Sequence, residues 1–203
     1  MDGVDASIIQ SDGYTRYNVI SDKYFKYDRV IFRELSTLRN KIKTSHDLRK
    51  FSEKLNVLEK KITIFHAKVV KKILNKSKVN VNFIGFHGQT IFHSAKKKIT
   101  RQLGDGKLLS KLTKKIVIYN FRKNDLKNGG QGAPLTPIFH KLLANKIGIN
   151  EPTIFINLGG IANITFITKH KIFSSDIGPA NCLIDQWVKT RSKKKCDLNG
   201  SLS

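Results

Sequence analysis

Cysteine is scarce in the 203-residue sequence, and the two that occur are Cys182 and Cys196. Their spacing matches neither a Cys-x-x-Cys pair nor a cluster of metal ligands, which excludes a disulfide scaffold and a zinc-finger module. Reduced thiols are the rule in the cytoplasm. We therefore expect a cytoplasmic protein.

Long hydrophobic runs are also missing. No stretch approaches the roughly 20 apolar residues that a membrane-spanning helix needs. The first residues do not combine a basic region with an apolar core, as a secretory signal would. We therefore expect a soluble, intracellular chain with no membrane partner.

Acidic residues are few: 15 Asp and Glu stand against 38 Lys and Arg, which gives a formal net charge of +23. Such an excess can indicate a nucleic-acid partner. The lysines are spread along the whole chain, however, in short groups such as 96–98 and 193–195, and no RNA-binding signature or basic heptad accompanies them. We interpret the charge as a compositional bias, and a basic nucleic-acid binder is the third and least favoured function class.

The hydrophobic pattern predicts an α/β fold. Apolar residues at helical spacing predict helices, with Asp28 and Ser45 as the caps of the first two; these helices are 28–43, 45–76, 107–114, 138–146 and 182–188. Runs rich in β-branched residues predict strands at 1–12, 17–27, 79–86, 116–121, 154–156, 161–168 and a last run that stops at Asp176. Strands 79–86 and 116–121 are apolar enough to be buried on both faces.

Polar and glycine-rich loops follow several of these strands, at 85–90, 122–134, 157–160 and 174–181. Because ligands of α/β sheets bind beyond the carboxyl ends of the strands, the loops could converge on one cleft. The loop 129–137 lacks the Lys-Ser/Thr of a phosphate-binding P-loop. A hinge, a substrate loop and a disordered surface loop remain open interpretations of it.

Asp176 is the candidate catalytic base. If its strand ends there, the carboxylate faces the N-terminus of the next helix, where exposed N–H groups beside Gly159, Gly160 and Gly178 could hold phosphate. A carboxylate beside a phosphate site suits phosphoryl transfer. From this stretch alone, two glycine turns and a capping Asp are the simpler interpretation.

The polar cluster at 87–93 is the candidate substrate site. His87 and His93 are not at the i, i+4 spacing of a helical metal pair, and no acidic residue is nearby, so no metal is predicted from a ligand motif. Side chains such as Gln89 and Thr90 suit hydrogen bonds to a sugar. A loop that satisfies its own backbone is the alternative.

Six motifs together give a specific resemblance. In order they are Gly85-Phe-His-Gly-Gln-Thr90, Gln102-Leu-Gly-Asp-Gly106, Phe121-Arg122 with Asp125, Gly129-Gly-Gln-Gly-Ala-Pro-Leu135, Asn157-Leu-Gly-Gly-Ile-Ala-Asn-Ile-Thr165 and Asp176-Ile-Gly-Pro-Ala-Asn181. The chain closely resembles the anhydro-N-acetylmuramic acid kinase family, sugar kinases with the actin-like, ribonuclease H-like two-lobed ATPase fold. The resemblance implies a nearly complete first lobe at 1–150 and a second lobe, only begun, at 151–203.

The resemblance also implies a reaction. ATP, with Mg²⁺, would phosphorylate the 6-oxygen of 1,6-anhydro-N-acetylmuramic acid while water opens the anhydro bridge, which gives N-acetylmuramic acid 6-phosphate in peptidoglycan recycling. Asp176 would activate the water, and a homodimer is expected. The implied sugar-binding residues are His87, Gln89, Thr90 and Arg122. The implied phosphate- and ATP-binding residues are Asp2, Gly3, Asp5, Gly159, Gly160 and Gly178.

The sequence departs from the family pattern in three places. The strand and Gly-Thr-Ser turn that precede Asp-Gly-Val-Asp in the family do not occur before Asp2, and Ala180 stands where the family usually has Gly. The region that should carry the adenosine site would lie beyond Ser203. We therefore expect little kinase activity from this chain alone, and an inactive gene fragment or one half of a split kinase is the alternative.

Overall fold

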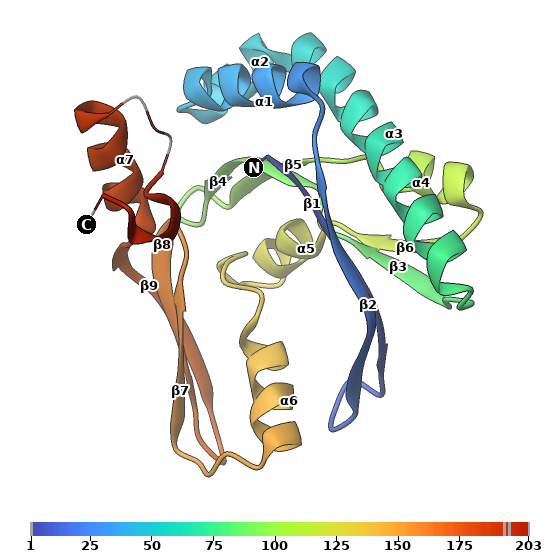
Figure 1. Cartoon of the computed structure of the whole chain (residues 1–203), viewed down its shortest axis with the longest axis vertical. Helices are drawn as coiled ribbons and strands as arrows, with labels where there is room; N and C mark the ends of the chain where they lie inside the picture. Colours follow the sequence, from blue (N-terminus) through green and yellow to red (C-terminus); the bar gives the residue numbers. More distant parts are fainter. Residues whose placement is uncertain (1, 193, 195, 203) are drawn as a thin grey trace. The chain divides into compact units, whose positions relative to one another are not determined.

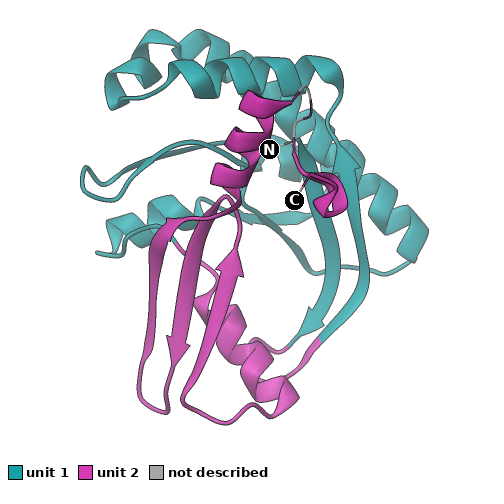
Figure 2. Ribbon diagram, turned by 60° about the vertical axis from the view of Figure 1, so that its left-hand side comes forward, with its two compact units in different colours: residues 1–11, 18–133 teal, residues 12–17, 134–203 magenta. Residues whose placement is uncertain are grey.

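The fold is mixed α/β, as predicted. A computed structural model describes residues 2–192, 194 and 196–202, and the strands of this described part form four small sheets. The chain divides into two compact units (Figure 2), Met1–Ser11 with Asn18–Ala133 and Asp12–Tyr17 with Pro134–Ser203. Residue 150, the expected lobe boundary, lies inside the second unit.

Three pairs of strands belong to the first unit (Figure 1). Strands β1 (Gly3–Ser11) and β2 (Tyr17–Lys26) form the predicted hairpin, and β3 (Phe83–Phe86) pairs in parallel with β6 (Ile116–Tyr119). A second hairpin joins β4 (Gln89–Ser94) to β5 (Ile99–Leu103). The sequence did not predict this hairpin, because its strands carry mostly polar residues that hydrogen-bond across the pair instead of alternating with apolar ones.

Five helices complete the first unit. They are α1 (Arg29–Lys41), α2 (Ser45–Lys50), α3 (Ser52–Ser77), α4 (Gly106–Thr113) and α5 (Phe121–Lys127). Asp28 caps α1 as predicted, since its Oδ1 accepts a hydrogen bond of 2.8 Å from the Ile31 N–H.

The prediction of one helix over 45–76 was wrong. The chain bends at Phe51 (φ −105°, ψ 17°), which separates α2 from α3. Ser45 is not the cap either: the Thr44 hydroxyl accepts from the Asp47 N–H, and the Asp47 carboxylate accepts from the Thr44 N–H. This reciprocal pair of bonds places the N-cap of α2 at Thr44, one residue earlier than predicted, while the helix itself begins at Ser45 as predicted.

The main core of the first unit lies between α3 and the elements around it. Leu35 of α1, Leu58 and Ile62 of α3, and Leu103 of β5 are almost completely buried in it. A smaller cluster joins Ala67 of α3 to β3 and α4. One face of the long helix α3 therefore organises the unit.

Strands β3 and β6 are not buried on both faces, contrary to the prediction. Ile84 and Val117 pack toward the cluster around Leu109 of α4, whereas the alternate residues Phe83 and Ile116 are 58% and 69% exposed. Helices cover one face of this strand pair, and the described residues leave the other face open to solvent.

The second unit is a three-stranded antiparallel sheet with a helix on one face. Its elements are α6 (Pro137–Ile147), β7 (Thr153–Leu158), β8 (Ile161–Ile167), β9 (Ile172–Pro179), α7 (Asn181–Arg191) and a 3₁₀ turn (Leu198–Gly200). Helix α6 packs on β8 and β9, where Thr165 and Ile167 are fully buried, and His140 of α6 hydrogen-bonds the Thr165 hydroxyl at 2.8 Å. The predicted hairpin, third strand and two helices are confirmed.

The other face of this sheet is apolar and open. Ile154, Ile156, Leu158 and Phe173 are between 55% and 65% exposed.

None of the helices in the described part of the chain is both long and apolar enough to cross a membrane.

A carboxylate on α3 ties the core to the end of β5. Both oxygens of Glu59 accept hydrogen bonds of 2.9 Å from the Arg101 guanidinium, and Oε1 also accepts from the Gly104 N–H at 3.0 Å. The Glu59 side chain is only 17% exposed. Loss of this carboxylate would leave the Gly104 N–H and the Arg101 Nη2 without a partner, while the Arg101 Nη1 would keep its bond of 3.1 Å to the Gln102 carbonyl oxygen.

We predict that Glu59→Ala lowers the free energy of unfolding by about 2 kcal/mol, because the Gly104 N–H and the Arg101 Nη2 lose their acceptor and must be rehydrated. The measurement is urea unfolding followed by circular dichroism. Glu34→Ala is the matched control: Glu34 pairs with Lys61 at 2.7 Å, but the two side chains are 35% and 41% exposed, so the loss should stay below about 1 kcal/mol. Equal losses in the two variants would contradict the structural role of Glu59.

Candidate active site

His87 and Arg122 form a hydrogen-bonded pair in the first unit. The Arg122 Nε–H donates to His87 Nε2 at 2.8 Å, and His87 Nδ1 lies 2.8 Å from the Gly88 carbonyl oxygen. Because arginine can only donate, His87 Nε2 is the acceptor and Nδ1 carries the ring proton. Loss of water around the ring, aided by the nearby guanidinium, lowers the pKa of His87, although the bond to Gly88 acts in the opposite direction. The imidazole is therefore neutral and orients Arg122.

Arg122 and Asp125 hold the glycine-rich loop. Both belong to the short helix α5, and the Arg122 Nη1 donates to the Gly132 carbonyl at 2.7 Å, while the Asp125 Oδ2 accepts from the Gly132 N–H at 2.7 Å. A Cβ on Gly130 would lie 2.1 Å from the same carboxylate oxygen. The loop is thus tethered along this stretch, and glycine is required where it crosses Asp125. Asp125 belongs to one of the six sequence motifs, but the sequence alone predicts no role for it.

Gln89 lies against the start of β1. Its Nε2 donates to the Gly3 carbonyl oxygen and to the Tyr27 hydroxyl, both at 3.2 Å. Burial raises the pKa of Tyr27 to about 12, so its hydroxyl is protonated. The structure therefore brings the predicted sugar residue Gln89 together with Gly3 of the predicted phosphate loop. Tyr27 was not predicted, and its spacing in the sequence offered no signal.

Asp2 and Asp5 flank Gly3 and are both exposed. Burial acts to raise the pKa of Asp2, but hydrogen bonds from its own backbone N–H and from the Tyr24 side chain outweigh it, and the net effect is a lowered pKa. The carboxylate at the beginning of β1 is therefore ionised near neutral pH.

Thr90 belongs to a row of polar side chains across the β4–β5 hairpin. The Gln102 Nε2 donates to the Thr90 hydroxyl at 3.4 Å and to the Thr100 hydroxyl at 2.7 Å, and His93 Nδ1 lies 3.1 Å from the Thr100 Oγ1. The row fixes the orientation of Thr90.

Within residues 2–192, 194 and 196–202, no three His, Cys, Asp or Glu side chains gather as metal ligands.

Asp176 lies in the second unit, inside β9 and not at the end of it. It is opposite Asn163 of β8, whereas Gly178 is opposite Ala162, so Ile177 is an extra residue in the ladder. This is a β-bulge, and it lets β9 continue to Pro179, which makes the predicted strand end at Asp176 wrong. The Asp176 carboxylate is exposed, and no side chain or N–H group of the described residues hydrogen-bonds it.

The N–H groups at the start of α7 are not exposed, contrary to the prediction. The N–H groups of Ala180 and Cys182 donate to the Gly160 carbonyl at 3.0 and 3.3 Å, and the Asn181 N–H donates to the Gly159 carbonyl at 3.0 Å. The glycine turn, by contrast, has open space beside it: a Cβ on Gly159 or Gly160 would meet no atom nearer than 3.5 Å. An anion at this place would have to approach the glycine turn itself.

The predicted site residues thus fall into two groups. His87, Gln89, Thr90 and Arg122 belong to the first unit with Asp2, Gly3 and Asp5. Asp176 belongs to the second unit with Gly159, Gly160 and Gly178.

The family model described as anhydro-N-acetylmuramic acid kinase matches residues 1–203. The chain belongs to the anhydro-N-acetylmuramic acid kinase family. This confirms the resemblance inferred from the six motifs.

Curated relatives bearing the same name agree. The chain is 55% identical to the anhydro-N-acetylmuramic acid kinase of Pelagibacter ubique over 206 residues, 37% identical to that of Agrobacterium fabrum over 209, and 36% identical to that of Rhizobium etli over 210. These matches cover 98–100% of the chain but only 55–56% of each relative. The chain therefore spans about half the length of these kinases.

We predict that His87 titrates below its ordinary pKa of 6.5 and that Arg122→Ala raises its pKa, because the variant removes a neighbouring positive charge and readmits water. The measurement is an NMR titration of the histidine Cε1 signals. His66 is the control: its pKa is lowered by burial against Tyr27 and Phe86, so it should not respond to the Arg122 change.

The lowered pKa of His87 also makes the stability of the folded chain depend on pH. Because the pKa of His87 is lower in the folded chain than its ordinary value, its contribution to the free energy of unfolding is fully present above pH 6.5. This contribution is lost as the pH falls through the folded pKa. Titration curves of His87 that coincide with and without Arg122 would rule out the guanidinium as a cause.

Proposed function

We propose that the chain takes part in the ATP-dependent conversion of 1,6-anhydro-N-acetylmuramic acid and water to N-acetylmuramic acid 6-phosphate. The observation that carries the proposal is Asp176, an exposed carboxylate at a β-bulge, in a member of this family. Its pairing partner Asn163 follows the open glycine turn by three residues. Bulges next to active sites commonly re-aim a side chain. The relatives' shared name supports the sugar and the reaction type.

Asp176 is the proposed general base. Its carboxylate takes a proton from a water molecule while the water oxygen bonds to the anomeric carbon. The bond from that carbon to the 6-oxygen breaks, the 6-oxygen bonds to the γ-phosphorus, and the bond from the γ-phosphorus to ADP breaks. The sugar gains a hydroxyl and a phosphoryl group, and the proton passes from Asp176 to solvent.

The sugar is proposed to bind at the cluster around His87. The substrate carries a carboxylate, and a guanidinium held by two neighbours suits a carboxylate. Arg122 has that support from His87 and Gly132. Gln89 and Thr90 would accept or donate hydrogen bonds to sugar hydroxyls from fixed positions.

ATP phosphates are proposed to bind at Asp2, Gly3 and Asp5 in the first unit and at Gly159, Gly160 and Gly178 in the second. Magnesium bound to the phosphates would spread the charge of the transferring group. Asp2 and Asp5 fit this ion, because Mg²⁺ prefers oxygen ligands and kinase sites supply only one or two carboxylates. The two groups of residues suit an actin-like arrangement, with residues 1–150 in one lobe and 151–203 in another, in a cytoplasmic homodimer that serves peptidoglycan recycling.

We also propose that the chain has little turnover alone. The exposed apolar residues Ile154, Ile156, Leu158 and Phe173 leave one face of the β7–β9 sheet without cover among the described residues. A cleft that excludes water needs a well-packed second wall. The part of the Pelagibacter ubique relative that the chain does not match is a natural candidate to supply it.

The test is a ³¹P NMR assay of sugar phosphate formation with ATP, Mg²⁺ and the anhydro sugar. We expect negligible product from the chain alone and turnover when that separate part of the Pelagibacter ubique relative is added. In the active mixture, Asp176→Asn should lower the rate about a thousandfold, because the water loses its base.

Asp185→Asn is the matched control. Asp185 lies on α7 in the same unit, and this variant should leave the rate unchanged.

Calorimetry should show the anhydro sugar binding to the chain without ATP, and Arg122→Ala should weaken this binding about tenfold. An Asp176→Asn mixture as active as the wild type, or a chain that neither binds the sugar nor responds to mixing, would refute the proposal.

A further inference from the structure

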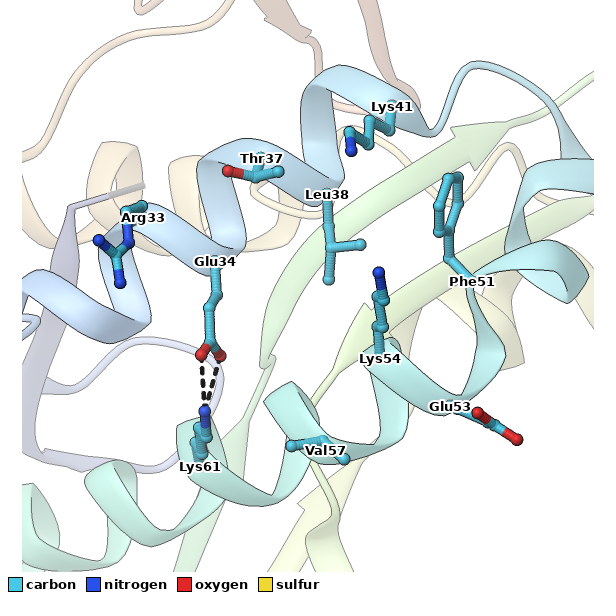
Figure 3. A pocket seen from close by; sticks show the side chains of 10 residues that line it. All are labelled: Arg33, Glu34, Thr37, Leu38, Lys41, Phe51, Glu53, Lys54, Val57 and Lys61. Carbon is cyan, nitrogen blue, oxygen red and sulfur yellow. Dashed lines mark hydrogen bonds and ion pairs between the residues drawn. The ribbon is translucent and has the colours of Figure 1, made fainter.

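A hollow of about 480 Å³ opens between α1 and α3 in the first unit (Figure 3). One wall is apolar, formed by Leu38, Phe51 and Val57. Its rim carries Arg33, Lys41 and Lys54. The hollow contains none of the residues proposed to bind the sugar, ATP or water, so it is separate from the site described above.

The positive charge of this hollow is only partly compensated, because four basic residues but only two carboxylates line it. Lys61 is neutralised by Glu34, with its Nζ 2.7 and 2.9 Å from the two carboxylate oxygens. Glu53 also lines the hollow, but its carboxylate is directed away from Lys54 in Figure 3. Arg33, Lys41 and Lys54 have no ion pair or hydrogen bond within the described residues.

Two of these cations face the same space. Figure 3 shows Lys41 extending from α1 and Lys54 from α3 into the gap beside Leu38 and Phe51. Two ammonium groups directed at one space repel each other, and an apolar wall beside them lowers the screening by water. An anion placed between them would relieve this repulsion.

We propose that the hollow binds an amphipathic organic anion. Its phosphate or carboxylate head would lie between Lys41 and Lys54, and its apolar body would lie on Leu38, Phe51 and Val57. The volume falls in the range of about 300–1,000 Å³ that is typical of small-molecule sites. A second copy of the chain is a poor occupant of this hollow, because a space of about 480 Å³ has the size of a small molecule and not of a folded surface. The inference goes beyond the proposed function and does not depend on it.

The test uses octyl phosphate and octanoate as probes, with the ¹⁵N-labelled 203-residue chain and NMR. Each probe combines an anionic head with an apolar body. At least one of them should therefore shift the amide signals of α1 and of the first turns of α3 in a saturable way. Inorganic phosphate, which lacks the apolar body, and octanol, which lacks the charge, should each bind at least about tenfold more weakly.

Lys41→Gln/Lys54→Gln should weaken binding of the better probe at least about tenfold. Lys71→Gln/Lys72→Gln is the matched control, because it removes the same charge from exposed positions of α3 outside the hollow. Val57→Asn, at a 57% exposed position that folding should tolerate, should weaken binding through the apolar wall alone. Four results would overturn the proposal: equal weakening of binding by the two double lysine variants, amide signals that shift elsewhere in the chain, no saturable binding of either probe, or binding of octanol as tight as that of the anions.

Discussion

The interaction on which the first unit depends is the contact of α3 with the point where β5 ends and α4 begins. Glu59 accepts from the Gly104 N–H, and one turn later the buried Thr63 hydroxyl accepts from the Asp105 N–H at 3.0 Å while donating to the Glu59 carbonyl oxygen. Two consecutive backbone donors are thus bound to one helix. Because β5 pairs with β4 in a fixed register, the same contact sets the position of Gln89 opposite Leu103. The proposed sugar site is therefore anchored by residues that never touch it.

A second chain of hydrogen bonds joins the candidate site residues to each other. His87 accepts from Arg122, Arg122 donates to the Gly132 carbonyl, and the Gly132 N–H donates to Asp125. Arg122 and Asp125 face the same loop because they are three residues apart on one helix. The short helix α5 therefore positions the two side chains that hold the glycine-rich loop. His87 must be neutral, because only its unprotonated Nε2 can accept a hydrogen bond from Arg122.

Much of this could be predicted from the sequence where the signal is local. The Asp28 cap, the glycine turn at 159–160 and the helix at 138–146 each follow from a few neighbouring residues, and they are confirmed. The β4–β5 hairpin could not be predicted, because polar cross-strand bonds such as Gln102 with Thr100 leave no hydrophobic period. The bulge at Ile177 could not be predicted from the sequence either, since it depends on how β9 pairs with β8.

The scarcity of acidic residues sharpens the choice of catalytic base. Most of the carboxylates in the described part already accept protein hydrogen bonds: Asp28 and Asp105 cap helices, Glu59 holds Arg101, and Asp125 holds Gly132. A carboxylate whose lone pairs are occupied cannot easily bind and deprotonate a water molecule. Asp176 has no such partner among the described residues and is exposed, and it pairs with Asn163, three residues after a glycine turn with room for a ligand. Asp5 is also exposed, but it belongs to the first unit, whereas Asp176 lies at the bulge of the strand pair that begins with the glycine turn. The physical reason to propose Asp176 for the proton transfer is therefore its availability at this place.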